Sequence, residues 1–115
     1  MTENNARKEF LGMKTMALDL EKFHVTHHAS EQRFELAVHG QIAELSYRRA
    51  PGTFSLDHTY VPPPIEGQGV AAKLTRAALN YARAEGLRVV PACSYVAAYI
   101  RSNPEYQDLV ASSKS

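Results

Sequence analysis

Hydrophobic and polar residues alternate through three consecutive stretches in the middle of the chain. These stretches are Arg33–Val38, Gln41–Arg48 and Thr53–Val61, and a period of two is the signature of a half-buried strand. His39–Gly40 and Pro51–Gly52 supply the turns between them, because Pro fixes φ and Gly tolerates a positive φ. Short turns join neighbouring strands antiparallel. The sequence therefore predicts a three-stranded β-meander.

A helical period of apolar positions replaces the alternation from about Gly69 to Glu85, and Gly86 is typical of a helix end. Leu87–Val90 then has the apolar, β-branched character of a short strand paired in parallel. A second helix, Tyr95–Ser102, follows with Ser94 as its predicted N-cap. The order β-β-β-α-β-α predicts an α+β (mixed α/β) fold, in which helices pack on a mostly antiparallel sheet.

The length of 115 residues suits one domain. We expect a poorly ordered or loosely packed N-terminal extension over residues 1–30, the folded domain over residues 31–110, and a polar tail over residues 111–115.

Charge and composition exclude several classes of function. The net charge is +1 without a dense Lys/Arg stripe, which argues against nucleic-acid binding. No apolar run is long enough to span a bilayer, and the N-terminus has no apolar stretch of signal-peptide length, so we expect a cytoplasmic protein. A single cysteine, Cys93, permits no internal disulfide. His24, His27 and His28 lack a partner motif, so we expect no metal site.

The segment Tyr60–Ala72 joins the third strand to the first helix and reads YVPPPIEGQGVAA. A glycine turn at a helix start leaves several backbone N–H groups unpaired, at the positive end of the helix dipole. Because glycine has no Cβ, a phosphate can approach this backbone closely. The segment therefore predicts an anion site.

Three interpretations of this turn follow from the residues alone. The spacing Gly67-x-Gly69-x-x-Ala72 matches the dinucleotide-binding fingerprint, but that fold requires a parallel βαβ unit and an acidic residue after its second strand. Here the second strand ends at Val90–Cys93 without a carboxylate. A P-loop is excluded, since no Gly-Lys-Ser/Thr follows the turn. A helix-starting turn with nothing bound is the structural alternative.

The same run resembles the acetyl-CoA pyrophosphate loop of the GNAT N-acetyltransferase superfamily, Gln/Arg-x-x-Gly-x-Gly/Ala. The preceding meander and the following helix-strand-helix agree with it. The segments Pro91–Tyr95 and Asn103–Tyr106 are similar to minimal, single-domain members of the superfamily. The resemblance covers about Gln32 to Val110. It implies acetyl-CoA or CoA as cosubstrate and an amine as acceptor, for which a protein lysine or N-terminus would suit so small a fold. The acceptor and the oligomeric state stay open.

The resemblance also implies a set of cofactor-binding residues. Tyr60 and Val61 would line the pantetheine arm and the acetyl carbonyl. The remaining positions are Gly67, Gln68, Gly69, Val70, Ala71, Ala72, Lys73 and Ser94. Lys73, with Arg76, can equally belong to a solvated helix face. Two positions depart from the family pattern: Glu66 stands where the loop has Gln or Arg, and Arg101 stands where a tyrosine acid is common.

Cys93 and His58 are the candidate catalytic residues. Cys93 lies between a strand end and a helix N-terminus, which lowers a thiol pKa; it could take the acetyl group or protonate the CoA sulfur. The alternative is a small buried apolar residue. His58 is in phase with Phe54, Leu56 and Tyr60, so it is either a core residue or a base. Tyr95 shapes the channel or fills the core.

The sequence thus favours an acetyl-CoA-dependent N-acetyltransferase that acts on an amine, by direct transfer or through Cys93. The alternative is a non-catalytic CoA-binding module, such as a sensor or partner subunit, which the small size and the missing tyrosine acid favour.

Overall fold

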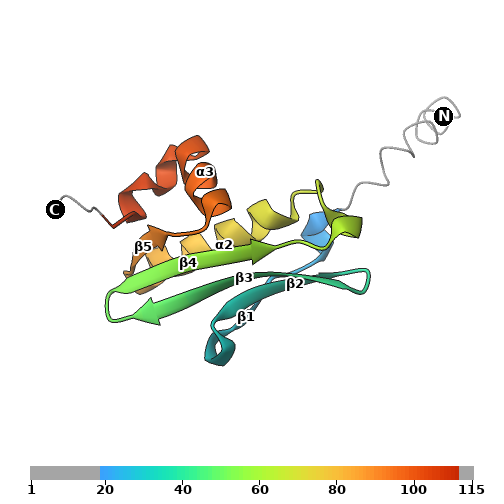
Figure 1. Ribbon diagram of the computed structural model, residues 1–115, viewed down its shortest axis with the longest axis horizontal. Helices are drawn as coiled ribbons and strands as arrows, with labels where there is room; N and C mark the ends of the chain where they lie inside the picture. Colours follow the sequence, from blue (N-terminus) through green and yellow to red (C-terminus); the bar gives the residue numbers. More distant parts are fainter. Residues whose placement is uncertain (1–18, 112–115) are drawn as a thin grey trace, which may run out of the picture.

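The computed structural model describes residues 19–111, and they form one layered α+β unit (Figure 1). Five strands make a single sheet in the order β1-β2-β3-β4-β5. Strands β1 to β4 pair antiparallel, whereas β5 pairs parallel to β4. Their bounds are β1 (Thr26–His28), β2 (Arg33–Val38), β3 (Gln41–Ala50), β4 (Thr53–Tyr60) and β5 (Arg88–Pro91). The predicted fold class is confirmed, including the β-meander and the parallel pairing of β5 with β4.

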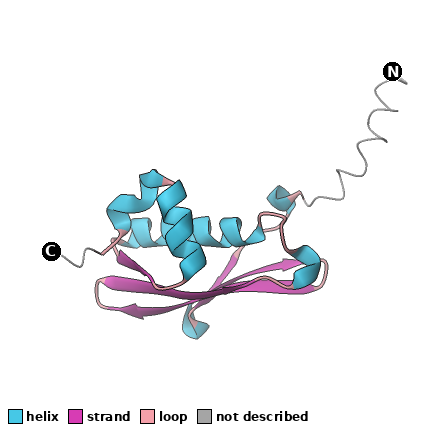
Figure 2. Ribbon diagram, turned by 45° about the horizontal axis from the view of Figure 1, so that its top comes forward, coloured by secondary structure: helices cyan, strands magenta, loops and turns pink. Residues whose placement is uncertain are grey.

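Helix α2 (Val70–Glu85) connects β4 to β5, and helix α3 (Ser94–Ser102) follows β5. Figure 2 shows both helices stacked above one face of the sheet. A 3-10 helix (Pro104–Leu109) leads to Val110, which forms a bridge with Val89 of β5. The N-cap of α3 is Cys93 rather than the predicted Ser94, because Cys93 keeps an extended backbone while Ser94 is already helical.

Local residue choice explains the two hairpin turns. His39 and Gly40 both adopt positive φ, +49° and +82°, as a two-residue turn that matches the strand twist requires. Gly52 supplies a φ of +76° in the next turn. Both predicted turns are therefore present, and they fix the register in which Val38 pairs with Gln41 and Ala50 with Thr53.

The core lies between the sheet and the two helices. Leu36, Leu45, Leu56 and Val89 point into it from the sheet, and Leu74 meets them from α2. All five are fully buried, so truncating Leu74 to alanine would cost about 2–5 kcal/mol of unfolding free energy. This packing holds α2 firmly against the sheet and thereby fixes the position of its N-terminus.

The sheet begins earlier in the chain than the expected domain start. Thr26–His28, within the stretch expected to be an N-terminal extension, forms β1 and pairs with Arg33–Glu35. Just before it, Leu20–Lys22 makes one turn of 3-10 helix, and Leu20, Phe23 and Val25 pack against the core. The predictions for residues 1–18 and 112–115 lie outside the described residues.

Candidate functional site

The chain between β4 and α2 folds into a compact turn anchored by Ile65, which is buried. Gly67 and Gly69 adopt φ of +75° and +87°, conformations that other residues take up only with strain. Gly69 is the N-cap of α2 and has no side chain to cap it, and the first turn of α2 carries no acidic residue. The positive end of this sixteen-residue helix is therefore left open toward solvent.

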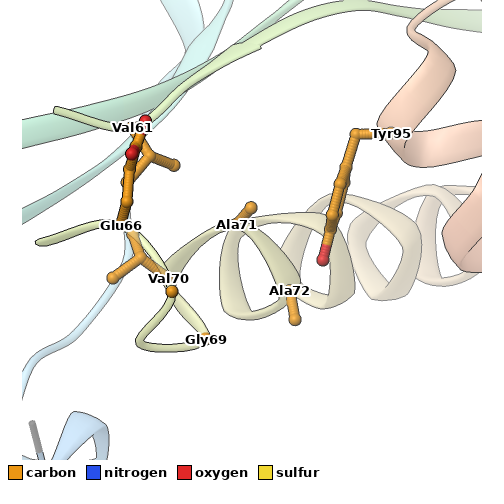
Figure 3. A pocket seen from close by; sticks show the side chains of 8 residues that line it. Val61, Glu66, Gly69, Val70, Ala71, Ala72 and Tyr95 are labelled. Carbon is orange, nitrogen blue, oxygen red and sulfur yellow. The ribbon is translucent and has the colours of Figure 1, made fainter. Parts of the chain in front are cut away.

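A cavity of about 430 Å³ lies at this helix N-terminus (Figure 3). The turn and the first helical residues form one wall, the end of β4 a second, and Tyr95 of α3 a third. The lining residues are Val61, Glu66, Gly67, Gly69, Val70, Ala71, Ala72 and Tyr95. A cavity that joins apolar walls to exposed backbone N–H groups is suited to an apolar chain that ends in an anionic group.

Six of the predicted cofactor-binding positions line this cavity: Val61, Gly67, Gly69, Val70, Ala71 and Ala72. Four others lie elsewhere. Tyr60 is 48% exposed outside the cavity, and Ser94 is exposed at the first turn of α3. Gln68 is in the turn without lining the cavity, and the Lys73 ammonium donates to the Leu20 carbonyl at 2.7 Å.

Tyr95 and Glu66 line the cavity without having been assigned to the binding site. Figure 3 shows the Tyr95 ring extending from α3 toward the first turns of α2, and the Glu66 side chain extending toward Val61. Tyr95 is 39% exposed. In the sequence it follows the predicted N-cap Ser94, and that position does not indicate whether its ring lines a channel or fills the core. Packing of α3 beside α2, which a linear pattern does not contain, decides its role.

A β-bulge changes the phase of β4 halfway along the strand. Ser46 pairs with His58, but the next residue of β3, Tyr47, pairs with Leu56, so Asp57 is an extra residue. After this point Thr59 shares a face with the buried Leu45. The bulge therefore turns Thr59 toward the helices and turns His58 and Tyr60 to the opposite face.

The predicted phase of His58 is therefore wrong. Phe54 and Leu56 are fully buried as expected, but His58 is exposed on the other side of the sheet. A strict alternation assumes one residue per pairing step, and the extra Asp57 breaks that assumption. Asp57 is held by Arg48, whose Nε donates to its carboxylate at 2.6 Å, and by Ser55 at 2.6 Å. The hydrogen bond from Arg48 is the largest of the causes that keep the pKa of Asp57 below its ordinary value.

Strands β4 and β5 separate at the bulge. Their parallel pairing ends at Leu56 and Pro91, and the Cys93 N–H then donates to the Leu56 carbonyl at 2.8 Å. Farther along, Thr59 Oγ1 lies 3.5 Å from Cys93 Sγ. The cavity-lining residues Val61 and Tyr95 follow two positions later on the same two segments. The only thiol of the chain therefore lies beside the cavity, where the strands diverge.

The surroundings of Cys93 favour its thiolate. Burial acts to raise the pKa of the thiol, but hydrogen bonds from the Thr59 hydroxyl and from the backbone N–H groups of Val96, Tyr95 and Thr59 outweigh it. The net pKa lies below the ordinary value for cysteine. Two of these donors belong to the first turn of α3, so the helix N-terminus contributes as expected from the sequence.

His27 and His28 have separate partners. His27 Nε2 lies 2.6 Å from the Tyr47 hydroxyl, whereas His28 pairs with Glu35 at 3.2 Å. Within residues 19–111, no three His, Cys, Asp or Glu side chains are arranged to hold a metal ion. In the same part of the chain, no helix has the length and apolar character needed to cross a membrane.

Comparison with known proteins places this geometry in a family. The model of the GCN5-related N-acetyl-transferase family matches residues 33–109, from the start of β2 to the end of the last 3-10 helix. A solution structure of a GCN5-like protein from Staphylococcus aureus has a TM-score of 0.62 and 27% sequence identity, covering 76% of this chain and 87% of that one.

Curated relatives carry the name Protein NATD1. The Xenopus tropicalis protein is 36% identical over 52 residues, which is 45% of this chain and 48% of that protein. The human protein is 39% identical over 49 residues, or 43% of each chain. The Danio rerio protein is 29% identical over 91 residues, covering 76% and 83%. The chain thus spans about half the length of the first relatives that it matches. Because the family model covers more than half of the chain and the fold agrees with it, the chain belongs to the GCN5-related N-acetyltransferase family.

Proposed function

We propose that the protein is an acetyl-CoA-dependent N-acetyltransferase, with the cavity at the N-terminus of α2 as the acetyl-CoA site. The observation that carries this proposal is the uncapped turn at Gly67 and Gly69, which opens into a cavity walled by Val61 and Tyr95. In its residues and in its place between β4 and α2, this turn resembles the loop that binds the pyrophosphate of acetyl-CoA in the GNAT superfamily.

The residues present fit a pyrophosphate and a pantetheine arm. The backbone N–H groups of Val70, Ala71 and Ala72 belong to the first turn of α2, where they lack intrahelical partners. Apart from Gly67 and its two chain neighbours, no residue has a heavy atom within 4 Å of the place where a Cβ on Gly67 would stand, so a phosphate can approach that backbone. Glu66 is the one carboxylate in the lining, and its charge would weaken the binding of an anion.

Cys93 supplies the reactive group of the covalent route. Its thiolate attacks the acetyl carbonyl, the bond between that carbon and the CoA sulfur breaks, and CoA leaves as a thiolate that takes a proton from solvent. A neutral amine then attacks acetyl-Cys93, the amide bond forms, Cys93 leaves as thiolate, and the amine proton passes to solvent. In the direct route the amine attacks the CoA thioester, the bond between the acetyl carbon and the CoA sulfur breaks, and the Cys93 thiol gives its proton to the leaving sulfur. The proton lost by the amine passes to solvent, from which Cys93 regains one.

The acceptor is an amine, for which a protein lysine or N-terminus suits the open site better than a fully enclosed small molecule. His58, the candidate base, lies on the far face of the sheet from the cavity lining, near the end of β4. In this proposal it acts only on an acceptor that approaches from that face. The protein is expected to work in the cytoplasm.

A non-catalytic CoA-binding module is the second candidate. It is favoured by the composition of the cavity lining, which contains no histidine and no basic side chain, with Glu66 as its one titratable carboxylate. Arg101 occupies the position where the family often has its tyrosine acid, and it lines a different cavity, between α3 and the C-terminal segment.

Mass spectrometry of the intact protein after incubation with acetyl-CoA separates these candidates. The covalent route predicts one added acetyl group on the wild type and none on Cys93→Ser, together with turnover on a panel of peptide amines. The direct route predicts turnover without an adduct. Absence of both, with CoA still bound, would establish the non-catalytic module, and absence of any CoA binding would remove both candidates.

A further inference from the structure

The short segment Asp19–Phe23 packs beside the N-terminus of α2 (Figure 1). Its one-turn helix is capped by Asp19, whose carboxylate accepts from the Glu21 N–H at 3.2 Å. Two contacts join this segment to Gly67–Gly69 and the first turn of α2, which together are called the cofactor turn here. The Lys73 ammonium donates to the Leu20 carbonyl at 2.7 Å, and the Leu20 Cδ1 atom lies 3.5 Å from the place where a Cβ on Gly69 would stand.

Lys73 connects these contacts into one unit. Its backbone N–H donates to the Gly69 carbonyl at 3.1 Å, which is the first hydrogen bond of α2. Its side chain reaches the Leu20 carbonyl, and the Leu20 side chain returns to cover Gly69. The three residues therefore form a closed set of contacts on the side of the turn that faces the N-terminal segment.

We propose that Asp19–Phe23 is a brace for the cofactor turn, in which Lys73 and Leu20 act as positioning residues for acetyl-CoA binding without touching the cofactor. The inference rests on the proposed acetyl-CoA site. Its physical basis is the freedom of the turn: glycine loses more backbone entropy on ordering than any other residue. A turn that is already ordered binds its ligand more tightly, because that entropy is not lost at the binding step.

Direct contact between Lys73 and a phosphate is the competing assignment. Both assignments predict weaker CoA binding after Lys73→Met, so that variant alone does not decide. They differ at Leu20, whose side chain covers Gly69 but carries no charge. The brace requires Leu20→Ala to weaken CoA binding, whereas a direct contact leaves the affinity unchanged or improves it by releasing Lys73. The two assignments also differ in the salt dependence of CoA affinity, which becomes weaker only when a contact with a phosphate is lost.

The test is calorimetric titration of CoA at two salt concentrations, on the full chain and its Leu20→Ala, Lys73→Met, Lys73→Arg and Lys22→Met variants. We expect Leu20→Ala and Lys73→Met to bind about threefold to tenfold more weakly, with unchanged salt dependence, as for the loss of one ordinary contact. Lys73→Arg retains a donor and should bind like the wild type. Lys22→Met is the matched control, since it removes a lysine from the same segment without altering the contact at Leu20.

Hydrogen exchange of the ligand-free protein tests the brace independently of CoA. The brace predicts faster exchange of the backbone N–H at position 73, which donates to the Gly69 carbonyl, in Leu20→Ala and Lys73→Met, but not in Lys22→Met. Unchanged exchange together with unchanged affinity in Leu20→Ala would overturn the inference. If the wild type binds no CoA, the proposed function fails, while the exchange measurement still decides whether the segment orders the turn.

Discussion

At the scale of single residues, Cys93 combines burial with donors that favour its charged form. The Thr59 hydroxyl is the main favourable contribution to a pKa below the ordinary cysteine value. Thr59→Val removes this donor while keeping the side-chain shape, so the thiol pKa should rise. The alkylation rate of Cys93 at neutral pH should fall about fivefold, the equivalent of one ordinary hydrogen bond.

The measurement is the pH dependence of iodoacetamide alkylation, which reports Cys93 alone because the chain has no other cysteine. Thr53→Val, on the same strand but paired with Arg88 at its far end, is the matched control. An alkylation profile that does not move in Thr59→Val would show that the hydroxyl does not tune the thiol.

Glu66 places a negative charge in the lining of a cavity proposed to hold phosphates. Glu66→Gln removes the charge with little change of shape. Because like charges repel, CoA affinity should rise about twofold to fivefold at low ionic strength and less at high salt. Calorimetry at the two salt concentrations checks this, with Glu85→Gln at the far end of α2 as control. Weaker binding by Glu66→Gln would mean that the carboxylate contributes a needed contact instead.

At the scale of elements, β1 is held to the sheet through His27. The imidazole stacks on Phe34 with ring centroids 4.1 Å apart and contacts the Tyr47 hydroxyl. Burial, with the neighbouring charges of His28 and Arg49, lowers the pKa of His27. The folded protein therefore binds this proton less readily than the unfolded chain does.

The free energy of unfolding should accordingly decrease as the pH is lowered through a defined window. The contribution of His27 to the free energy of unfolding is fully present above the pKa of about 6.5 that histidine has in the unfolded chain. It is lost as the pH falls from there to below the lowered pKa of His27 in the folded state. Urea unfolding across this window should show a smaller loss for His27→Gln than for the wild type. His24→Gln, which alters an exposed histidine, should retain the full loss. An equal loss in both variants would assign the pH effect to other groups.

Periodicity predicted most elements because each is long and one-sided. The buried set Phe34, Leu36 and Val38 follows a period of two without interruption, and β2 has the predicted bounds. Helix α2 likewise begins one residue after Gly69 and ends before Gly86. Short elements with few apolar residues were less visible. The three residues of β1 show no alternation of their own, and contacts with β2 determine their conformation.

The bulge in β4 marks the limit of pattern-based prediction at the candidate site. Asp57 is stabilised there by Arg48, which lies on the neighbouring strand, and by Ser55, a residue type that does not by itself predict a bulge. Moving the phase by one residue exchanges the faces of His58 and Thr59, so Thr59 is the β4 side chain that lies beside Cys93. The glycine turn was predictable because its chemistry resides in consecutive residues, whereas Tyr95 and Leu20 reach the site only through tertiary packing.

At the scale of the whole molecule, the proposed function depends on the sheet being covered on one face. Helices α2 and α3 pack there and enclose the cavity between them and the end of β4 (Figures 2 and 3). The other face carries charged pairs such as Arg33–Glu35 and Arg48–Asp57, as expected where an antiparallel sheet meets water. In the proposed function, acetyl-CoA approaches the separated end of β4 and β5 from the helix side and the acceptor approaches from the other side.

The most direct test of the acetyl-CoA site is an amide NMR titration that compares CoA with pantetheine, which lacks the phosphates. A pyrophosphate site at this turn predicts that CoA binds about tenfold or more tightly than pantetheine, since the backbone of the turn would recognise the pyrophosphate. It further predicts that the largest shifts fall on the amides of residues 67–72 and of Tyr95. Equal affinity for the two compounds, or CoA-induced shifts that leave residues 67–72 unmoved, would show that this turn does not bind the pyrophosphate.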